Sequence, residues 1–233
     1  MTSPVRTQWI PISAGFGGYL ALPPSGSGPG LLLFQEIFGV NEHIRAVAEQ
    51  YALDGFVVLA PDVFWRQAPR VELGYVGEER ARGMALAQAL QPAEVMADIG
   101  AALAALQARP EASGRRCGAI GYCMGGRLAY LAAASTDIAA AVPFYGGGIQ
   151  GQLERAAAIR CPLQFHYAEH DDHIPPDAVE RVRRATAGIA GTELHVYPGS
   201  MHGFNCWARA SYQAAAAALS HGRATAFLAQ QLF

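Results

Sequence analysis

The sequence predicts a single α/β domain over residues 1–233, with a mostly parallel, doubly wound sheet and an N-terminal hairpin. Short apolar runs, typical of strands buried on both faces, alternate with longer segments of helical periodicity. The length of 233 residues fits one α/β domain, and no internal repeat or low-complexity tract divides the chain. Alternating strands and helices imply βαβ units with helices on both faces of the sheet.

The expected strands begin with two alternating segments, residues 7–12 and 19–22, separated by Gly15, Gly17 and Gly18. This pattern is typical of a β-hairpin. A loop rich in Pro, Ser and Gly follows. Buried strands are then expected at residues 31–34, 56–60, 116–121, 140–144, 163–167 and 193–197.

The first expected helix follows Asn41, a residue suited to capping. Within it Ile44, Val47, Ala48 and Tyr51 fall at i, i+3, i+4 and i+7, so they share one helix face. Further helices are expected at residues 78–90, 93–107, 124–134, 176–187 and 207–232.

The charged residues exclude several kinds of function. All 17 basic residues are Arg and none is Lys. The sequence therefore excludes Schiff-base chemistry, a P-loop Lys and a Ser–Lys dyad. The net charge of −2 also argues against binding to nucleic acid, which favours a clustered basic surface.

The expected location is the cytoplasm. Residues 1–10 contain no apolar run that resembles a signal peptide, and no apolar stretch reaches the length of a membrane span. The four cysteines lack paired metal-site spacing and are expected to be reduced. The expected partner is therefore a small molecule rather than a membrane; a monomer is compatible with the sequence.

A candidate nucleophile lies in the segment Gly-Tyr-Cys-Met-Gly-Gly at residues 121–126. It follows an apolar strand and begins a helix, the setting of a nucleophile elbow, with Cys123 in the place usually taken by Ser. A helix N-terminus favours the thiolate form of cysteine. The alternative is a small buried Cys in a Gly-rich turn.

The chain order supports the first interpretation. Asp171 follows the expected strand 163–167, and His202 follows the strand 193–197. The order nucleophile, acid, histidine is that of an α/β-hydrolase, and carboxyl ends of strands are where open α/β sheets bind ligands. Asp172 is the rival acid. His202 would accept the thiol proton while Asp171 fixes its tautomer.

The expected oxyanion hole needs two backbone N–H groups. Met124, directly after the nucleophile, supplies one, and Ile37, in the loop after strand 31–34, supplies the other. Glu36 lies beside this hole, where a carboxylate is unexpected, and a role in controlling the thiol is inferred for it. A metal site at His166, His170 and His173 is a weaker alternative, and no metal or cofactor is expected.

These segments resemble the dienelactone hydrolase family of α/β-hydrolases. The resemblance runs from Leu31 to Phe204, and its carriers are Gln-Glu-Ile-Phe-Gly-Val-Asn at 35–41, Ala-Pro-Asp at 60–62, the Cys elbow, Phe-Tyr-Gly at 144–146, residues 171–175 and His-Gly-Phe at 202–204. It implies a Cys123–Asp171–His202 triad and hydrolysis of dienelactone to maleylacetate without metal or cofactor. It also implies that Glu36 holds the thiol in a resting state and accepts its proton.

The same resemblance implies two Arg residues that bind a substrate carboxylate. Arg82 is the first choice for one, with Arg80 as the second choice; Cys206 occupies the place of the other. Cys cannot replace a bidentate Arg, so Arg209 is a possible substitute. Tyr145 is a further candidate for substrate contact.

Three other interpretations stay open. The protein could hydrolyse an ester or thioester that lacks a carboxylate. It could be a non-catalytic, α/β-hydrolase-like binding module, although such modules usually lose a member of the triad. Finally, Cys123 could be a redox sensor that pairs with Cys117.

Overall fold

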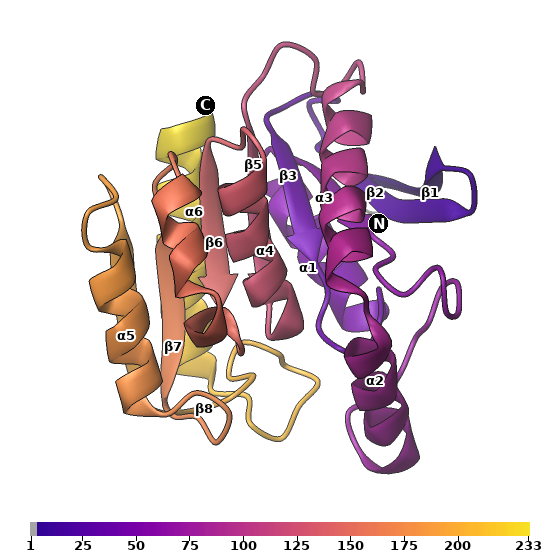
Figure 1. Ribbon diagram of the computed structural model, residues 1–233. Helices are drawn as coiled ribbons and strands as arrows, with labels where there is room; N and C mark the ends of the chain where they lie inside the picture. The colour runs from indigo at the N-terminus through magenta and orange to yellow at the C-terminus, as the bar shows by residue number, and fades with distance from the viewer. Residues whose placement is uncertain (1–3) are drawn as a thin grey trace.

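The computed structural model describes residues 4–233 and contains one eight-stranded sheet flanked by helices (Figure 1). The strand order is β1-β2-β4-β3-β5-β6-β7-β8. The strands, in this spatial order, are Arg6–Ser13, Phe16–Leu22, Val57–Pro61, Gly30–Phe34, Cys117–Tyr122, Ala140–Phe144, Gln164–His170 and Glu193–Met201. From β4 to β8 every pairing is parallel, which confirms the predicted α/β class.

The N-terminal hairpin is confirmed. β1 and β2 pair antiparallel, and β2 then pairs antiparallel with β4, so the hairpin extends the edge of the parallel sheet. The central strands β3, β4, β5 and β6 are buried along their whole length. This burial explains why they appear in the sequence as continuous apolar runs rather than as alternating ones.

Helices cover both faces of the sheet, as the alternating pattern predicts. α1 (Glu42–Leu53) and α6 (Ala214–Leu232) lie behind it in the view of Figure 1, whereas α3 (Pro92–Gln107), α4 (Met124–Ser135) and α5 (Pro176–Thr186) lie in front. The cap of α1 is also confirmed, because the Asn41 side chain accepts a hydrogen bond from the Ile44 backbone N–H at 3.2 Å.

The predicted start of the last helix is wrong. α6 begins at Ala214 and not at residue 207. Consecutive turns replace the first part of the expected helix: the Cys206, Arg209 and Tyr212 N–H groups donate to the carbonyls of the residues three positions earlier. These turns fold residues 203–213 back over the C-terminal ends of the strands, so Arg209 reaches Glu36 instead of projecting from a helix.

α2 (Gly77–Ala89) is loosely attached to the rest of the fold. Gly83 is its only buried residue, and a Cβ at that position would lie 2.4 Å from the Ile37 carbonyl oxygen. Among the described helices, none is by itself long and apolar enough to span a membrane, and α2 with α3 passes that test only as a pair bent by 93°.

Candidate active site

The candidate nucleophile stands at a sharp turn between β5 and α4. Cys123 has φ 56° and ψ −116°, a conformation that costs energy for a residue with a side chain. Its neighbours must be glycines: a Cβ at Gly121 would lie 2.1 Å from the Gly125 carbonyl oxygen, and one at Gly125 would lie 2.1 Å from the Phe34 carbonyl oxygen. The turn therefore depends on close backbone approach, and it holds the sulfur at the N-terminus of α4.

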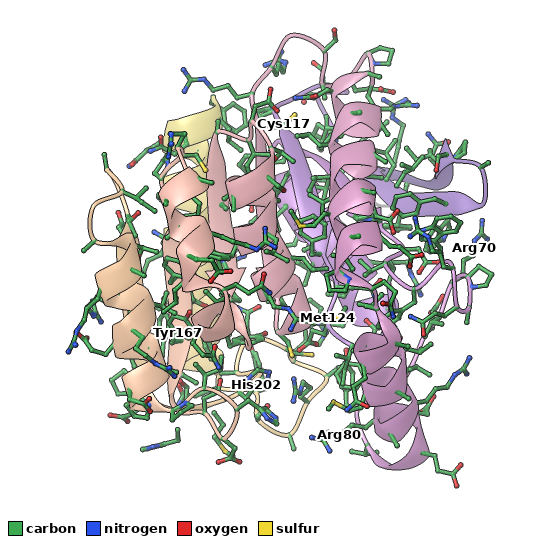
Figure 2. All side chains as sticks on the ribbon, in the orientation of Figure 1. Arg70, Arg80, Cys117, Met124, Tyr167 and His202 are labelled. Atoms are coloured by element: carbon green, nitrogen blue, oxygen red, sulfur yellow. The ribbon has the colours of Figure 1, made fainter. Side chains whose placement is uncertain are left out.

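Cys123 opens into a pocket of about 490 Å³ at the carboxyl end of the sheet. Figure 2 shows Met124, His202 and Arg80 at this end of the molecule, with Cys117 at the opposite end of β5. Cys117 is buried and separated from Cys123 by the length of a strand. The two thiols therefore cannot form the disulfide that a redox sensor with this pair would need.

The predicted acid and histidine lie together beside this pocket. His202 Nδ1 is 2.8 Å from Asp171 Oδ2. The other carboxylate oxygen of Asp171 accepts the backbone N–H groups of His173 at 2.9 Å and Ile174 at 3.2 Å. Asp171 is thus fixed by the turn after β7, whereas its rival, Asp172, is exposed.

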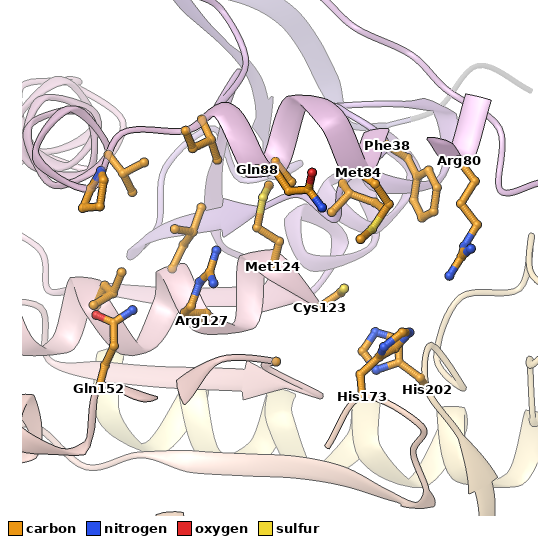
Figure 3. Close-up of a pocket in the computed structure, with 18 of the residues that line it drawn as sticks. Phe38, Arg80, Met84, Gln88, Cys123, Met124, Arg127, Gln152, His173 and His202 are labelled. Carbon is orange, nitrogen blue, oxygen red and sulfur yellow. The ribbon is translucent and has the colours of Figure 1, made fainter. Parts of the chain in front are cut away.

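The surroundings of His202 favour its protonated form. Burial disfavours a charged imidazole, but the charge of Cys123 and the hydrogen bond to Asp171 outweigh it and raise the pKa of His202 to about 10. Nε2 is buried and has no hydrogen bond to any other group of residues 4–233. That nitrogen is therefore available for a hydrogen bond with a group in the pocket. Figure 3 shows Cys123 and His202 at the same end of the pocket.

Both expected oxyanion-hole donors line the pocket next to Cys123. Met124 is the first residue of α4, so its N–H has no partner within the helix. Ile37 lies in the loop after β3, and Gly83 of α2 packs closely against its carbonyl. This contact sets the position of the Ile37 peptide.

Glu36 is fully buried and pairs with an arginine that the sequence could only suggest. Arg209 Nη1 donates to Glu36 Oε1 at 2.9 Å, and the second carboxylate oxygen has no partner in the described chain. Burial raises the pKa of Glu36, while the positive charges of Arg209 and His202 act against that rise. Cys206 is buried and lies outside the pocket lining, so Arg209 supplies the cation there.

Two residues expected to contact substrate, Arg82 and Tyr145, do not line the pocket. Arg80 lines the pocket and Arg82 does not, although both lie on the exposed part of α2, so the structure favours the second choice over the first. Tyr145 is fully buried and outside the pocket lining; its ring packs edge-on against His202, with centroids 5.0 Å apart. Tyr145 therefore packs against the imidazole and does not line the pocket.

The three histidines of the metal alternative do not gather at one point. His166 is hydrogen-bonded to Tyr197 and Gln164 in the core. His170 is exposed and lies near Glu169. The ring of His173 packs against that of His202, with centroids 4.9 Å apart. In residues 4–233 a different trio has metal-ligand chemistry: Glu36, His43 and Cys206, with ligand atoms within 4.8 Å of one another. The guanidinium on Glu36 disfavours a cation there.

Comparisons with known proteins show the family of this chain. Residues 16–232 match the model of the dienelactone hydrolase family. A carboxymethylenebutenolidase from a Pseudomonas species is 36% identical over 197 residues, covering 84% of this chain and 81% of its own. A carboxymethylenebutenolidase from Pseudomonas putida is 31% identical over 215 residues, covering 92% and 91% of the two chains.

Among solved structures, a protein from Klebsiella pneumoniae, provisionally named as a dienelactone hydrolase, superimposes with a TM-score of 0.85 and 31% identity. The match covers 97% of this chain and 99% of that one. The family match over residues 16–232 extends over nearly the whole fold and includes the segments that build the pocket. The chain belongs to the dienelactone hydrolase family and is a hydrolase of lactone or ester substrates.

Proposed function

We propose that the protein hydrolyses its lactone or ester through an acyl-enzyme on Cys123. The single observation that carries the proposal is the half-buried sulfur at a strained turn, beside a His202 that is held by Asp171 at 2.8 Å. A nucleophile, a base and an orienting acid in this order are the parts that covalent acyl transfer requires.

The proposed reaction has two stages, acylation of Cys123 and hydrolysis of the acyl-enzyme. His202 Nε2 takes the proton of Cys123, and the sulfur bonds to the carbonyl carbon. The resulting oxyanion accepts hydrogen bonds from the backbone N–H groups of Ile37 and Met124. The carbon–oxygen bond then breaks, and the imidazolium returns its proton to the leaving oxygen. Water, deprotonated by His202, hydrolyses the resulting thioester and frees the thiol.

Mass spectrometry tests the covalent intermediate. With excess 4-nitrophenyl acetate, quenched in acid within the first turnovers, the intact protein should gain one acetyl group, and peptide mapping should place it on Cys123. The other three cysteines are buried and serve as internal controls. Turnover accompanied by acetylation at another residue, or none on Cys123 under rapid quenching, would contradict the proposal.

The substrate group is proposed from the charges next to the sulfur. Carboxymethylenebutenolidases, to which the chain is similar, take a lactone that carries a carboxylate. Of the four arginines that line the pocket, Arg80 and Arg209 lie at the Cys123 end and are proposed as the cations for such a group. Arg209 is already paired with Glu36, so a substrate carboxylate at this end would compete with Glu36 for the guanidinium. A neutral ester is the alternative, and the largely apolar lining favours it.

We also propose that Glu36 controls the thiol through charge. The variant Glu36→Gln removes a buried negative charge near His202 and leaves Arg209 unpaired, so the surroundings of Cys123 become more positive and favour the thiolate. We expect iodoacetamide to modify Cys123 severalfold faster at mildly acidic pH. Peptide mass spectrometry at a series of pH values measures the rate.

The control for this experiment is Glu180→Gln, which removes the same charge from α5, outside the pocket. Its alkylation profile should coincide with that of the wild type. Superimposable profiles for the wild type and Glu36→Gln would remove Glu36 from the control of the thiol.

A further inference from the structure

The pocket continues well beyond the reacting atoms. Figure 3 shows Cys123, His202 and Arg80 at one end of it, and Arg127 and Gln152 toward the other. A lactone needs only the first end. The extension must therefore be explained by a longer substrate or by water.

The walls of this extension are apolar faces of three helices. On α4 the lining residues recur at i, i+3, i+4 and i+7, so they form one continuous stripe that leads away from the sulfur. The stripe and the facing residues of α2 and α3 are Met124, Arg127, Leu128 and Leu131; Met84, Ala87 and Gln88; and Pro92, Val95 and Met96. From residue 123 the helix rises about 6 Å to Arg127 and about 12 Å to Leu131, a range that matches a chain of several carbon atoms.

Positive charge without a counter-charge lies along this channel. Arg127 is half-buried, and its guanidinium has no hydrogen bond or ion pair with any other residue of the range 4–233; the side chain packs against Gly148. Arg155 is also half-buried and donates to Gln152 Oε1 at 2.9 Å, again without a carboxylate among the described residues. Arg209, at the catalytic end, differs because Glu36 neutralises it.

Two unpaired guanidinium groups beside an apolar channel are unfavourable unless an anion joins them, because half-buried charges lose hydration. A purely apolar ligand would leave them unpaired, and a short anionic ligand held near Arg80 would not reach them. A ligand that matches both the apolar walls and the two guanidinium groups is a chain that is apolar in the middle and anionic at its far end.

We propose that the channel along α4 binds esters whose apolar chain ends in a carboxylate, with Arg127 and Arg155 as the anion site. This inference rests on the proposed esterase function at Cys123 and adds a second anion site, separate from the Arg80 and Arg209 pair. The matching substrates are half-esters of linear dicarboxylic acids, or the equivalent esters with the acid on the alcohol side.

The test compares 4-nitrophenyl half-esters of succinic, adipic, suberic and sebacic acid with neutral 4-nitrophenyl esters of equal chain length. For the wild type, kcat/KM of the half-esters should rise with length, by up to about fourfold for each methylene buried. For the longest pair, the ratio of kcat/KM for the anionic over the neutral ester should be about tenfold to a hundredfold, the effect of a charge-assisted hydrogen bond.

Arg127→Ala should reduce that ratio to near one, and Arg127→Gln, which keeps most of the packing against Gly148, should do the same if charge is the cause. Arg127→Lys should keep part of the preference. The matched control is Arg160→Ala: Arg160 is exposed, donates to the Ala157 and Ile159 carbonyls and lies outside this pocket, so the ratio should stay at the wild-type value.

Three results decide the outcome. A wild-type ratio near one at every length, or an unchanged ratio in the Arg127 variants, overturns the proposal. A preference that is greatest for succinate and is lost in Arg80→Ala also overturns it, because the anion then binds at the catalytic end. Acetyl esters of ω-hydroxy acids, followed by pH-stat, test the alcohol side; loss of their preference in Arg127→Ala supports the same site with the chain on the leaving group.

The neutral esters distinguish a failure of the anion site from a failure of the proposed hydrolysis through Cys123. If the wild type hydrolyses them through Cys123 but ignores the distal carboxylate, the anion site alone is disproved. If hydrolysis of the neutral esters does not depend on Cys123, the proposed catalytic function fails, whatever the ratios are.

Discussion

Replacing Cys123 by alanine is expected to abolish ester hydrolysis, lowering kcat by roughly 10⁴-fold or more. The variant has no atom that can bond to the carbonyl carbon, while His202 and the backbone donors stay in place. What remains is the small rate from water held next to the two N–H groups. Steady-state hydrolysis of 4-nitrophenyl acetate measures the loss, and circular dichroism with thermal melting checks that the fold persists.

A second variant and a control make this result specific. Cys123→Ser keeps a nucleophile of similar size, but its hydroxyl is far less acidic than a thiol, so partial activity at most is expected. Cys161→Ala removes a buried thiol outside the pocket and should keep catalysis. Full activity in Cys123→Ala would show that the sulfur is not the nucleophile.

Replacing Asp171 by asparagine is expected to lower kcat by about 10³- to 10⁴-fold with little change in fold. The reason lies in the second oxygen of Asp171, which accepts the N–H groups of His173 and Ile174. Those donors keep the amide oxygen of an asparagine on their side, so its NH₂ faces His202 Nδ1. The imidazole then carries its proton on Nε2 and cannot accept the proton of the thiol.

The pH dependence gives this variant a second signature. The hydrogen bond and charge of Asp171 help to raise the pKa of His202 to about 10, so the substitution lowers that pKa. A raised histidine pKa stabilises the folded protein below the unfolded value near 6.5 and loses this effect as the pH rises through about 10. Thermal melts should therefore show less decline between these pH values in Asp171→Asn than in the wild type.

Asp172→Asn is the matched control, because it removes the same charge from the exposed neighbour. It should leave kcat and the melting profile close to those of the wild type. Equal losses in the two variants would mean that the carboxylates act only as part of the local charge, and not through the tautomer of His202.

Local sequence patterns predict the structure well where neighbouring residues allow only one conformation. Asn41 caps α1, and the glycines at 121 and 125 form the sharp turn, because both features depend on neighbours within a few residues. The His202–Asp171 contact was also predictable, since the carboxyl ends of parallel strands lie at one edge of a sheet.

The errors concern contacts that local patterns do not specify. α2 buries only Gly83, so its periodicity could not show that Arg80 rather than Arg82 faces the pocket. The Arg209–Glu36 pair joins residues 173 positions apart, through turns at residues 207–213 that were predicted to be helical. The distal channel was missed although a signal existed: Arg127 interrupts the apolar stripe of Met124, Leu128 and Leu131.

The loose attachment of α2 has a consequence for how such an enzyme diversifies. The proposed triad residues follow β5, β7 and β8, which belong to the continuous sheet, whereas α2 contributes mostly exposed side chains. Substitutions at Met84, Ala87 or Gln88 therefore carry little stability penalty and still alter the wall that a substrate touches. Gly83 is the exception, because its contact with the Ile37 carbonyl leaves no room for a methyl group. Laboratory evolution toward new esters should accumulate changes around that glycine while the glycine itself stays fixed.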